Sequence, residues 1–575
     1  MIILGINAHH ADSSAAIFVD GKMIAAIEEE RFRRVKHWAG FPSLAIEFCL
    51  KEARLLMEQV DFIAIGRDPK SKLFQKLLFW SCHPLASLSY IQKRIFNSRQ
   101  ISSGLVEDLC SLSGIRTEII EHKLRQVEHH RSHLSSAFFA SPFDEAAILS
   151  LDGSGDFTTT MTAIGKGNKI EVLDSINFPH SIGIFYTAFT QLLGFPHYGD
   201  EYKVMGLAPY GDPGLTNKVK ELIQWPEEGR FRLDLSYLRS PAKGYAFYEN
   251  NIPIVPSLFS KKMEAVFGKA RQEGEPLTQY HMDLAASVQK ATEETVFKLL
   301  TFLHTKTGYD KVCIAGGVAQ NSVLNGKITR NTPFKQVYIP PAGHDAGISM
   351  GAALYVQHHL EGLKRQEPIH SAYTGSYFSD DVIEKLLKEK GVGYTKTECD
   401  KRYATVTECL INGGVVGWFN GRAEFGPRAL GGRSILVDPR RGDAKEILNK
   451  KIKRRESFRP FAPSILKEYV DEYFEVNDTV PFMEKVFPIR KNKQATVPAV
   501  THVDGTGRLQ TVDKLISPDY YKLIDCFRIK TGVPILLNTS FNENEPIVNS
   551  PEEALNCFLR TEMDMLVLEN FIVHR

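Results

Sequence analysis

ILGINAHHADSSAAIFVDGKMIAAIEEERF, residues 3–32, decides the fold because its plan occurs a second time further along the chain. Apolar and polar residues alternate over strand-like lengths, and Asp20-Gly21 stands where a tight hairpin turn would lie. Residues 146–177, AAILSLDGSGDFTTTMTAIGKGNKIEVLDSIN, repeat the order: an apolar strand, a loop of Asp, Gly and Ser, a second strand, a turn at Gly167-Asn168 and a third strand. Two copies of one unit predict a two-lobed α/β structure.

The rest of the chain mixes helical and strand-like segments, as α/β proteins do. Helical spacing predicts helices over 181–195 and 277–307 and a loop opening into a helix over 338–360. Glycine and proline punctuate 199–211, which is expected to be a loop, and 212–275 is expected to be an irregular insertion. Strands are expected at 414–419 and 533–540.

A domain boundary is expected over 361–378, where the periodicity lapses in polar residues. We therefore predict a first domain of residues 1–365, with insertions near 70–118 and 212–275, and a second α/β domain of residues 366–575. The duplication within the first domain is the pattern of a two-lobed nucleotide-binding ATPase.

Composition limits the kind of partner. The 575-residue chain is 43% hydrophobic and 24% charged with a net charge of +2, so any anion site must be a local cluster and no nucleic acid is expected. Its eight cysteines are scattered without a CxxC pair, which argues against a zinc knuckle or a disulfide framework. The start, MIILGINAHH, reads as a buried strand and not as a signal peptide, so a cytoplasmic protein is expected.

One segment, LFQKLLFWSCHPLASLSYIQKRIF (73–96), is apolar with basic flanks. Lys76, His83, Pro84 and Lys93 leave too short an apolar run to span a bilayer. We expect a surface helical insertion, with interfacial contact to a lipid or lipid-linked substrate as the alternative.

The stretch VEHHRSHLSSAFF (127–139) is rich in histidine. His129 and His133 are four apart, so on a helix they would share a face and could hold one ion, although an isolated HxxxH also fits a structural role. Asp152 follows an apolar strand, and Asp345 lies in the glycine-flanked loop PPAGHDAG. Two imidazoles and two carboxylates suit Fe²⁺, Mn²⁺ or Zn²⁺.

A glycine pair after a strand, Gly316-Gly317, would let a nucleotide approach the backbone closely, and Asn321 could hydrogen-bond its ribose or phosphate. Between Arg428 and Arg459 basic residues outnumber acidic ones by 11 to 4. The run could be a solvated face or a nucleic-acid surface, but glycine, proline and aromatic neighbours favour fixed arginines around a small anion. Asn538, Thr539 and Ser540 follow an apolar strand and could cradle phosphate oxygens.

With these residues in view, the chain resembles the carbamoyltransferase family that includes the tobramycin, cephamycin and nodulation-factor enzymes. The similarity runs from residue 3 to the C-terminus and includes EEERF, HHxxH, DGxG, K-x-MGLAPYG, AGGVxxN, PPAxxD, GPRALGxRS, FRPFAP and LNTSFNxNEPIV. The N-terminal part looks like the ATPase lobe of tRNA threonylcarbamoyladenosine enzymes, with the ASKHA fold of duplicated RNase H-like lobes also found in actin and Hsp70. The C-terminal part is similar to a YrdC domain.

The resemblance implies a two-stage reaction with carbamoyl phosphate, ATP with Mg²⁺, and a hydroxylated acceptor. Carbamoyl-adenylate would form in the C-terminal domain, and the acceptor would attack it in the N-terminal domain. The implied metal ligands are His129, His133, Asp152 and Asp345, with Fe²⁺ the favoured ion, and Asp152 would also contact the nucleotide. The implied adenylate-site residues are Lys203, Gly317 and Asn321, and the implied phosphate-site residues are Arg428, Arg433, Lys453, Arg459, Arg508, Asn538 and Ser540.

One departure concerns the acceptor-side base. The family often has His-Asp-Ser-Ser-Ala-Ala where this chain has Ala11-Asp12-Ser13-Ser14-Ala15-Ala16. His10 and Asp12 are the candidates to act instead, with Lys36 and His37 as alternatives. The insertions near 73–99 and 212–275 are expected to shape the acceptor pocket.

Other functions stay open on the sequence. The chain could be a tRNA-modifying threonylcarbamoyl enzyme, an actin-like ATPase that acts as a scaffold, or a basic nucleic-acid-binding module. A homo-oligomer is possible. The expected function is ATP-dependent O-carbamoyl transfer to a small-molecule or glycan acceptor.

Overall fold

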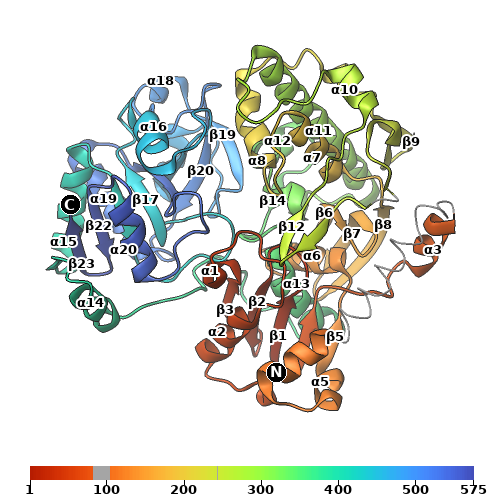
Figure 1. The fold of residues 1–575 in the computed structure, drawn as a ribbon, viewed down its shortest axis with the longest axis horizontal. Coiled ribbons are helices and arrows are strands. Elements are labelled where there is room, and N and C mark those ends of the chain that lie inside the picture. Colours follow the sequence, from red (N-terminus) through yellow and green to blue (C-terminus); the bar gives the residue numbers. More distant parts are fainter. Residues whose placement is uncertain (82–103, 242–243) are drawn as a thin grey trace. The chain divides into compact units, whose positions relative to one another are not determined.

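The computed structural model describes residues 1–81, 104–241 and 244–575, which pack as two compact units (Figure 1). Unit 1 consists of residues 1–320 and 328–369, and unit 2 of residues 321–327 and 370–575. Both are mixed α/β structures.

Unit 1 contains two five-stranded sheets with the same topology. The first has the order β3-β2-β1-β4-β5 and is built from β1 (Ile2–Asn7), β2 (Ser14–Val19), β3 (Lys22–Glu28), β4 (Phe62–Ile65) and β5 (Leu124–Gln126). The second has the order β14-β13-β6-β7-β8 and is built from β6 (Glu145–Gly155), β7 (Thr158–Lys166), β8 (Lys169–Asn177), β13 (Lys311–Ala315) and β14 (Gln336–Tyr338). In both, the first three strands form an antiparallel meander and the other two add in parallel. The predicted duplication is confirmed by this shared order and direction.

The turns follow the local sequence. Asp20 and Gly21 both have positive φ (48° and 90°), as a two-residue hairpin between antiparallel strands requires. Gly167 (φ 56°) serves the β7–β8 hairpin in the same way.

Two helices lie between the sheets of unit 1. α13 (Ile348–Leu354) packs on β1, β2 and β4, whereas α6 (His129–Phe138) packs on β6, β7 and β13, and the two helices contact each other (Figure 1). They approach closely because Gly351 faces the backbone of Ser132, where a Cβ would lie 2.0 Å from its carbonyl oxygen. This packing places α6 beside the carboxyl ends of β6 and β13.

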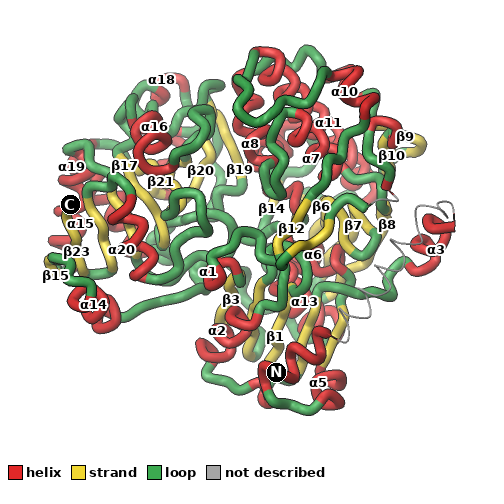
Figure 2. The backbone as a smooth tube through the Cα atoms, in the orientation of Figure 1, coloured by secondary structure: helices red, strands yellow, loops and turns green. Residues whose placement is uncertain are grey.

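Further helices of unit 1 surround the sheets (Figure 2). They are α1 (Glu30–Arg33), α2 (Ser43–Ala53), α3 (Leu73–Ser81), α5 (Thr117–Lys123), α7 (Ile182–Leu192), α8 (Glu201–Leu207), α9 (Thr216–Lys220), α10 (Lys261–Phe267) and α11 (Gln279–Thr307). The helices predicted over 181–195 and 277–307 are thus present, and α11 ends at Gly308 in the left-handed conformation.

Two expectations for unit 1 were wrong. Residues 199–211 are not a loop, because Glu201–Leu207 forms α8. Asp200 and Glu201 lie at the start of this helix, where acidic side chains are favourable. Residues 212–275 are not irregular within the described part, because they form α9, α10, the strand pair β9 (Ile223–Glu227) and β10 (Arg230–Leu233), and the hairpin β11 (Phe247–Glu249) and β12 (Ile252–Ile254). These strands are short and joined by polar turns, so the sequence shows no long periodic pattern of apolar residues there.

The apolar segment 73–96 is only partly described. Its first part forms α3, and the remainder lies outside the described residues. Among the helices that the structure describes, none is both long and apolar enough to cross a bilayer.

Unit 2 is built on one nine-stranded sheet with the order β15-β23-β22-β16-β17-β21-β18-β20-β19. Its strands are β15 (Thr395–Lys396), β16 (Val416–Phe419), β17 (Arg433–Val437), β18 (Ala462–Leu466), β19 (Lys485–Pro488), β20 (Thr506–Val512), β21 (Ile535–Ser540), β22 (Met565–Leu568) and β23 (Phe571–His574). Its helices are α14 (Asp380–Glu389), α15 (Cys399–Ile411), α16 (Ala444–Ile447), α17 (Val470–Tyr473), α18 (Lys491–Gln494), α19 (Pro518–Thr531) and α20 (Pro551–Arg560). The strands predicted at 414–419 and 533–540 correspond to β16 and β21.

Candidate metal centre and anion site

Helix α6 presents two histidines on one buried face. His129 and His133 are one helical turn apart, and their ring centroids lie 4.7 Å from each other. Glu128 caps the helix by accepting a hydrogen bond from the backbone N–H of Arg131. The helix start therefore fixes the direction in which both imidazoles point.

Asp152 reaches the histidines from the end of β6. Pairing with β7 is interrupted between Leu151 and Gly155, so Asp152, Gly153 and Ser154 form a bulge and not the open loop expected from the sequence. Asp152 Oδ2 lies 3.0 Å from His129 Nε2, and Asp152 Oδ1 accepts a 3.0 Å hydrogen bond from the backbone N–H of Gly317.

The glycine pair makes that hydrogen bond possible. Gly316 has φ +98°, and a Cβ there would lie 2.1 Å from the carbonyl oxygen of Leu151. Only glycine allows so close an approach of the β13 end to β6. The Gly317 N–H is thereby directed at Asp152.

Asp345 supplies the second carboxylate. It begins the short 3₁₀ turn Asp345–Gly347, and its backbone carbonyl accepts a 3.1 Å hydrogen bond from Asn7 Nδ2 at the end of β1. Asp345 Oδ1 lies 3.4 Å from His133 Nε2 and 3.7 Å from His129 Nε2. The end of β1 thus supports the backbone of this cluster residue through Asn7.

The cluster has the donor set of a divalent-cation site. One ligand atom from each of His129, His133, Asp152 and Asp345 lies within 4.8 Å of all the others, and all four residues are buried. Among the described residues, His133 Nε2 and Asp345 Oδ1 are buried without a hydrogen-bond partner. Two imidazole nitrogens and two carboxylate oxygens fit Fe²⁺, Mn²⁺ or Zn²⁺.

The electrostatics show how strongly these groups interact. Burial acts to raise the pKa of Asp152, but the neighbouring histidines outweigh it and hold that pKa well below its ordinary range. Burial acts to lower the pKa of His133, but Asp152 and Asp345 raise it to about 9. The carboxylates are therefore ionised, and a bound cation must displace the proton of His133.

His10 and Asp12 lie next to the cluster. His10 Nδ1 is 2.9 Å from Asp345 Oδ2, and this contact outweighs burial and raises the pKa of His10. Asp12 Oδ1 lies 2.8 Å from His37 Nδ1. Burial acts to lower the pKa of His37, but Asp12 raises it to about 9, so the protonated His37 ring stabilises the Asp12 carboxylate at neutral pH.

Unit 2 holds a cluster of arginines. Burial lowers the pKa of Arg508 well below its ordinary value, and the charges of Arg428 and Arg455 lower it further. Arg508 Nε donates to Ser322 Oγ at 3.1 Å. The charges of Arg428 and Arg455 thus act on Arg508, and an anion beside them would relieve this repulsion.

Comparison with known sequences decides the family. Two family models match the chain: Carbamoyltransferase N-terminus over residues 2–354 and Carbamoyltransferase C-terminus over residues 407–575. The chain belongs to the carbamoyltransferase family. It is an enzyme that transfers carbamoyl groups.

Relatives of this carbamoyltransferase match over most of their length. The chain is 40% identical over 608 residues to the uncharacterized protein sll1178 of Synechocystis, covering 99% of this chain and 96% of that protein. It is 38% identical over 576 residues to the nodulation protein NolNO of Sinorhizobium fredii, covering 99% of this chain and 80% of that protein. Among solved structures, HypF of T. kodakarensis covers 64% of this chain and 49% of its own at 14% identity, with a TM-score of 0.30, too low to carry an argument.

The residues predicted for the adenylate site of this carbamoyltransferase have the following contacts, and their role there stays a prediction. Gly317 contacts Asp152, as described. Lys203 Nζ pairs with Asp200 Oδ1 at 2.8 Å. Asn321 Oδ1 accepts the backbone N–H of Leu324 at 3.1 Å and so caps α12 (Ser322–Asn331), which gives it a structural role.

Three residues predicted for the phosphate site make hydrogen bonds within the fold, and their role at that site stays a prediction. The Arg433 guanidinium is fully buried and donates to the carbonyls of Ser376, Gly421 and Gly432. Lys453 Nζ donates to Ser540 and to Asn542, both to backbone carbonyls and to side-chain oxygens. Asn538 Nδ2 donates to Ala429 O, Ser464 Oγ and Gln510 Oε1.

Two other residues predicted for the phosphate site make fewer contacts within the fold. Arg459 pairs with Glu456 at 2.7 Å and has 14% of its side chain exposed. Ser540 Oγ donates to Asn542 Oδ1 at 2.8 Å. Arg455 was not predicted, because nothing in the sequence distinguished it within the basic run. In the structure its guanidinium carbon lies 4.8 Å from the ring centroid of Phe461, and its Nε donates to Asn449 Oδ1 at 2.9 Å.

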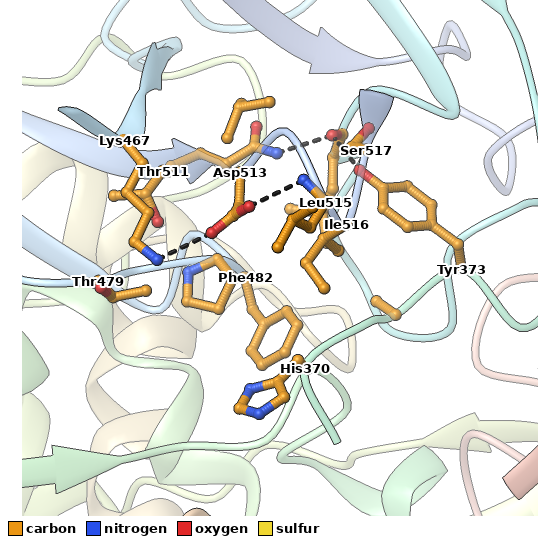
Figure 3. A pocket seen from close by; sticks show the side chains of 15 residues that line it. His370, Tyr373, Lys467, Thr479, Phe482, Thr511, Asp513, Leu515, Ile516 and Ser517 are labelled. Carbon is orange, nitrogen blue, oxygen red and sulfur yellow. Dashed lines mark hydrogen bonds and ion pairs between the residues drawn. The ribbon is translucent and has the colours of Figure 1, made fainter. Parts of the chain in front are cut away.

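Unit 2 also contains a cavity of about 280 Å³ near the GPRALGG loop (Figure 3). Tyr373 OH and Gln510 Nε2 both donate to the carbonyl of Leu430, each at 2.7 Å. On its wall Lys467 Nζ pairs with Asp513 Oδ2 at 2.8 Å. The charge of Lys467 is thus paired with that of Asp513 on this wall.

Proposed function

We propose that this carbamoyltransferase is an ATP-dependent O-carbamoyltransferase that works in two stages. In unit 2, carbamoyl phosphate is hydrolysed to carbamate and phosphate. An oxygen of carbamate then attacks the α-phosphorus of ATP, which gives carbamoyl-adenylate and pyrophosphate. In unit 1, an acceptor hydroxyl attacks the carbamoyl carbon, AMP leaves, and the hydroxyl proton passes to a base.

The fold supports this division of work. The two sheets of identical topology in unit 1 agree with an ASKHA-type ATPase domain, and we assign unit 2 as the YrdC-like domain that forms the adenylate. Arg428, Arg455 and Arg508 would hold the phosphate groups, because converging guanidinium groups stabilise the charge that develops on them. Arg459 would assist once it leaves Glu456.

The single observation that carries the proposal is the buried cluster of two histidines and two aspartates. His129, His133, Asp152 and Asp345 would hold one divalent cation, with Fe²⁺ favoured, and Mg²⁺ would accompany ATP. Such a cation supplies Lewis acidity toward the carbamoyl oxygen or the adenylate phosphate. The chain itself excludes water, since all four residues are buried.

His10 is the favoured acceptor-side base. Its Nδ1 faces Asp345, which orients the ring and stabilises the imidazolium that forms when the hydroxyl proton arrives. Asp12 positions the neighbouring loop through its contact with His37.

The test is whether ATP is converted to AMP only when carbamoyl phosphate is present. We expect AMP and pyrophosphate in the wild type and loss of both in Arg459→Ala. Wild-type ATP consumption by Arg459→Ala would refute the assignment of unit 2. Release of ADP would instead point to an ATPase scaffold, and incorporation of labelled threonine into an adenylate would point to a threonylcarbamoyl enzyme.

A further inference from the structure

A tight turn in unit 2 carries a histidine that the sequence motifs did not single out. The segment HVDGT, residues 502–506, forms a three-residue loop that leads into β20. The carbonyl of His502 accepts a hydrogen bond from the N–H of Gly505 at 3.0 Å, and the N–H of His502 donates to the carbonyl of Thr506 at 2.8 Å. Gly505 has φ +78°, as the last position of such a loop requires. His502 and Thr506 therefore stand opposite each other, with their side chains side by side.

The hydrogen bonds of this loop fix which ring nitrogen of His502 carries the proton. Thr506 Oγ1 lies 2.7 Å from Asp504 Oδ1 and donates to it, because a carboxylate can only accept. A hydroxyl has one hydrogen, so the Nδ1 of His502, 3.0 Å from Thr506 Oγ1, donates to that oxygen. In a neutral imidazole the other nitrogen, Nε2, is then a hydrogen-bond acceptor.

The surroundings of the ring keep it neutral. Burial is the largest cause that lowers the pKa of His502, and the charges of Arg508 and Lys445 lower it further. Together they outweigh Asp504 and the backbone of Phe461, which act in the opposite direction, and bring the pKa to about 4. A nitrogen with so low a pKa holds a transferred proton poorly, so it suits the role of hydrogen-bond acceptor better than that of a base.

The ring shares one face of the sheet with the arginine cluster. Arg508 follows Thr506 by two residues on β20, so the two side chains lie on the same face. The parallel neighbour of β20 is β18, and Phe461, which acts on the His502 ring, directly precedes β18. The guanidinium of Arg455 lies over the Phe461 ring. The histidine and the arginines thus belong to the same end of these two strands.

His502 Nε2 has an unused capacity at this place. Among the residues that the structure describes, it is a buried nitrogen without a hydrogen-bond partner. Leaving a buried acceptor unpaired costs free energy, so a ligand that donates to it gains affinity. The cations whose charges act here, Arg428, Arg455, Arg508 and Lys445, can only donate. A ligand that fits all of them carries an anionic group and one N–H or O–H donor.

We propose that His502 recognises the amino group of carbamoyl phosphate, with Nε2 accepting a hydrogen bond from the NH₂ of this substrate and of the carbamate formed from it. This inference rests on the proposed function and adds to it a residue that selects the substrate. The NH₂ is the donor group that carbamoyl phosphate retains in its fully ionised form, since its phosphate and carbonyl oxygens then only accept. Acetyl phosphate has a methyl group in place of the NH₂, so it leaves Nε2 unpaired and binds less tightly.

Matched variants separate recognition from packing. His502→Leu removes the acceptor and keeps a side chain that fills much of the space, whereas His502→Gln keeps an acceptor oxygen at a similar distance from the backbone. Val503→Ala is the control, because Val503 is the next residue of the same loop and is 56% exposed.

The experiment uses the full chain with Mg²⁺ and ATP and follows carbamoyl-phosphate-dependent ATP–pyrophosphate exchange. The exchange gives the KM for carbamoyl phosphate, and acetyl phosphate and inorganic phosphate are added as competing ligands to obtain their inhibition constants. In the wild type we expect the KM to lie about tenfold below the inhibition constant of acetyl phosphate. His502→Leu should raise the KM about tenfold at an unchanged kcat and leave both inhibition constants within about threefold. His502→Gln and Val503→Ala should stay within about threefold of the wild type in all three constants.

Three results overturn the inference while exchange is intact. They are a wild-type inhibition constant of acetyl phosphate equal to the KM of carbamoyl phosphate, a wild-type KM in His502→Leu, or an equal weakening of all three ligands in that variant, which would assign His502 to packing. The first of these needs no variant, so it decides the matter even if His502→Leu does not fold. A wild-type enzyme without exchange overturns the proposed function itself, and the two failures are thus distinguishable.

Discussion

Replacing Gly155 with alanine perturbs the metal centre and leaves all four proposed ligands in place. Gly155 ends β6, directly beside α6. A Cβ there would lie 2.1 Å from Cγ and Cδ2 of His129, whereas Cβ atoms in proteins essentially never come within 3.0 Å of another heavy atom. The imidazole of His129 must therefore move by about 0.9 Å or more, because the backbone at Gly155 is close-packed and cannot move away instead.

That displacement exceeds what a metal centre tolerates, since ligand distances are held within about 0.2 Å. We expect Gly155→Ala to bind Fe²⁺ at least about 100-fold more weakly than the wild type. The strain should cost about 1–3 kcal/mol of folding stability, which a two-unit chain of this size can withstand. Gly153→Ala is the matched control, because it lies two residues earlier in β6 and its Cβ meets nothing within 4 Å.

The assay loads each protein anaerobically with Fe²⁺, removes free ion, and measures bound iron by mass spectrometry and affinity by competition with a chelator. Circular dichroism and thermal melting check that both variants are folded. We expect one equivalent of iron in the wild type and in Gly153→Ala, and a small fraction of that in Gly155→Ala. If folded Gly155→Ala retained a full equivalent with wild-type affinity, His129 would not be a ligand and the proposed centre would be wrong.

Three further predictions concern other charged groups. Burial acts to lower the pKa of His37, but Asp12 raises it from 6.5 to about 9. The contribution of the His37–Asp12 pair to the free energy of unfolding is therefore complete below pH 6.5 and disappears as the pH rises through 9. The melting temperature of the wild type should fall over that range, and that of His37→Gln should fall less. In free energy of unfolding, the two proteins should differ by about 1 kcal/mol after solvent screening. Parallel curves of melting temperature against pH would contradict this. For the arginine cluster, 10 mM inorganic phosphate should raise the wild-type melting temperature by about 2 °C or more and leave Arg508→Met unchanged, and an equal rise in both would place the anion elsewhere. Lys453→Met should lower the free energy of unfolding in urea by about 2–3 kcal/mol while keeping the phosphate response, and the reverse pattern would make Lys453 a ligand group.

Sequence patterns predicted the parts of the fold that rest on local chemistry. The duplicated strand units could be recognised because Asp20-Gly21 and Gly167-Asn168 mark hairpin turns between alternating segments. The HxxxH spacing and the glycine-flanked acids indicated which residues could gather, and the structure places His129, His133, Asp152 and Asp345 together. The hairpin β11–β12 could not be predicted, because two strands of three residues carry too little periodicity and depend on contacts with Ala39 for their place.

The residues predicted for the phosphate site show that residue type alone does not reveal the contacts a cation makes in the fold. Arg433 and Lys453 carry the charge that an anion site needs, but their donors are used by carbonyl and side-chain oxygens of the surrounding loops. Arg455 looks no different in the sequence, yet it contributes charge at Arg508 and lowers its pKa. The internal hydrogen bonds of each cation depend on oxygens that can be distant in sequence, such as Ser540 for Lys453, or near, such as Asn449 for Arg455. Residue type alone therefore does not separate a cation that ties down a loop from one whose charge reaches a neighbouring arginine, as that of Arg455 reaches Arg508.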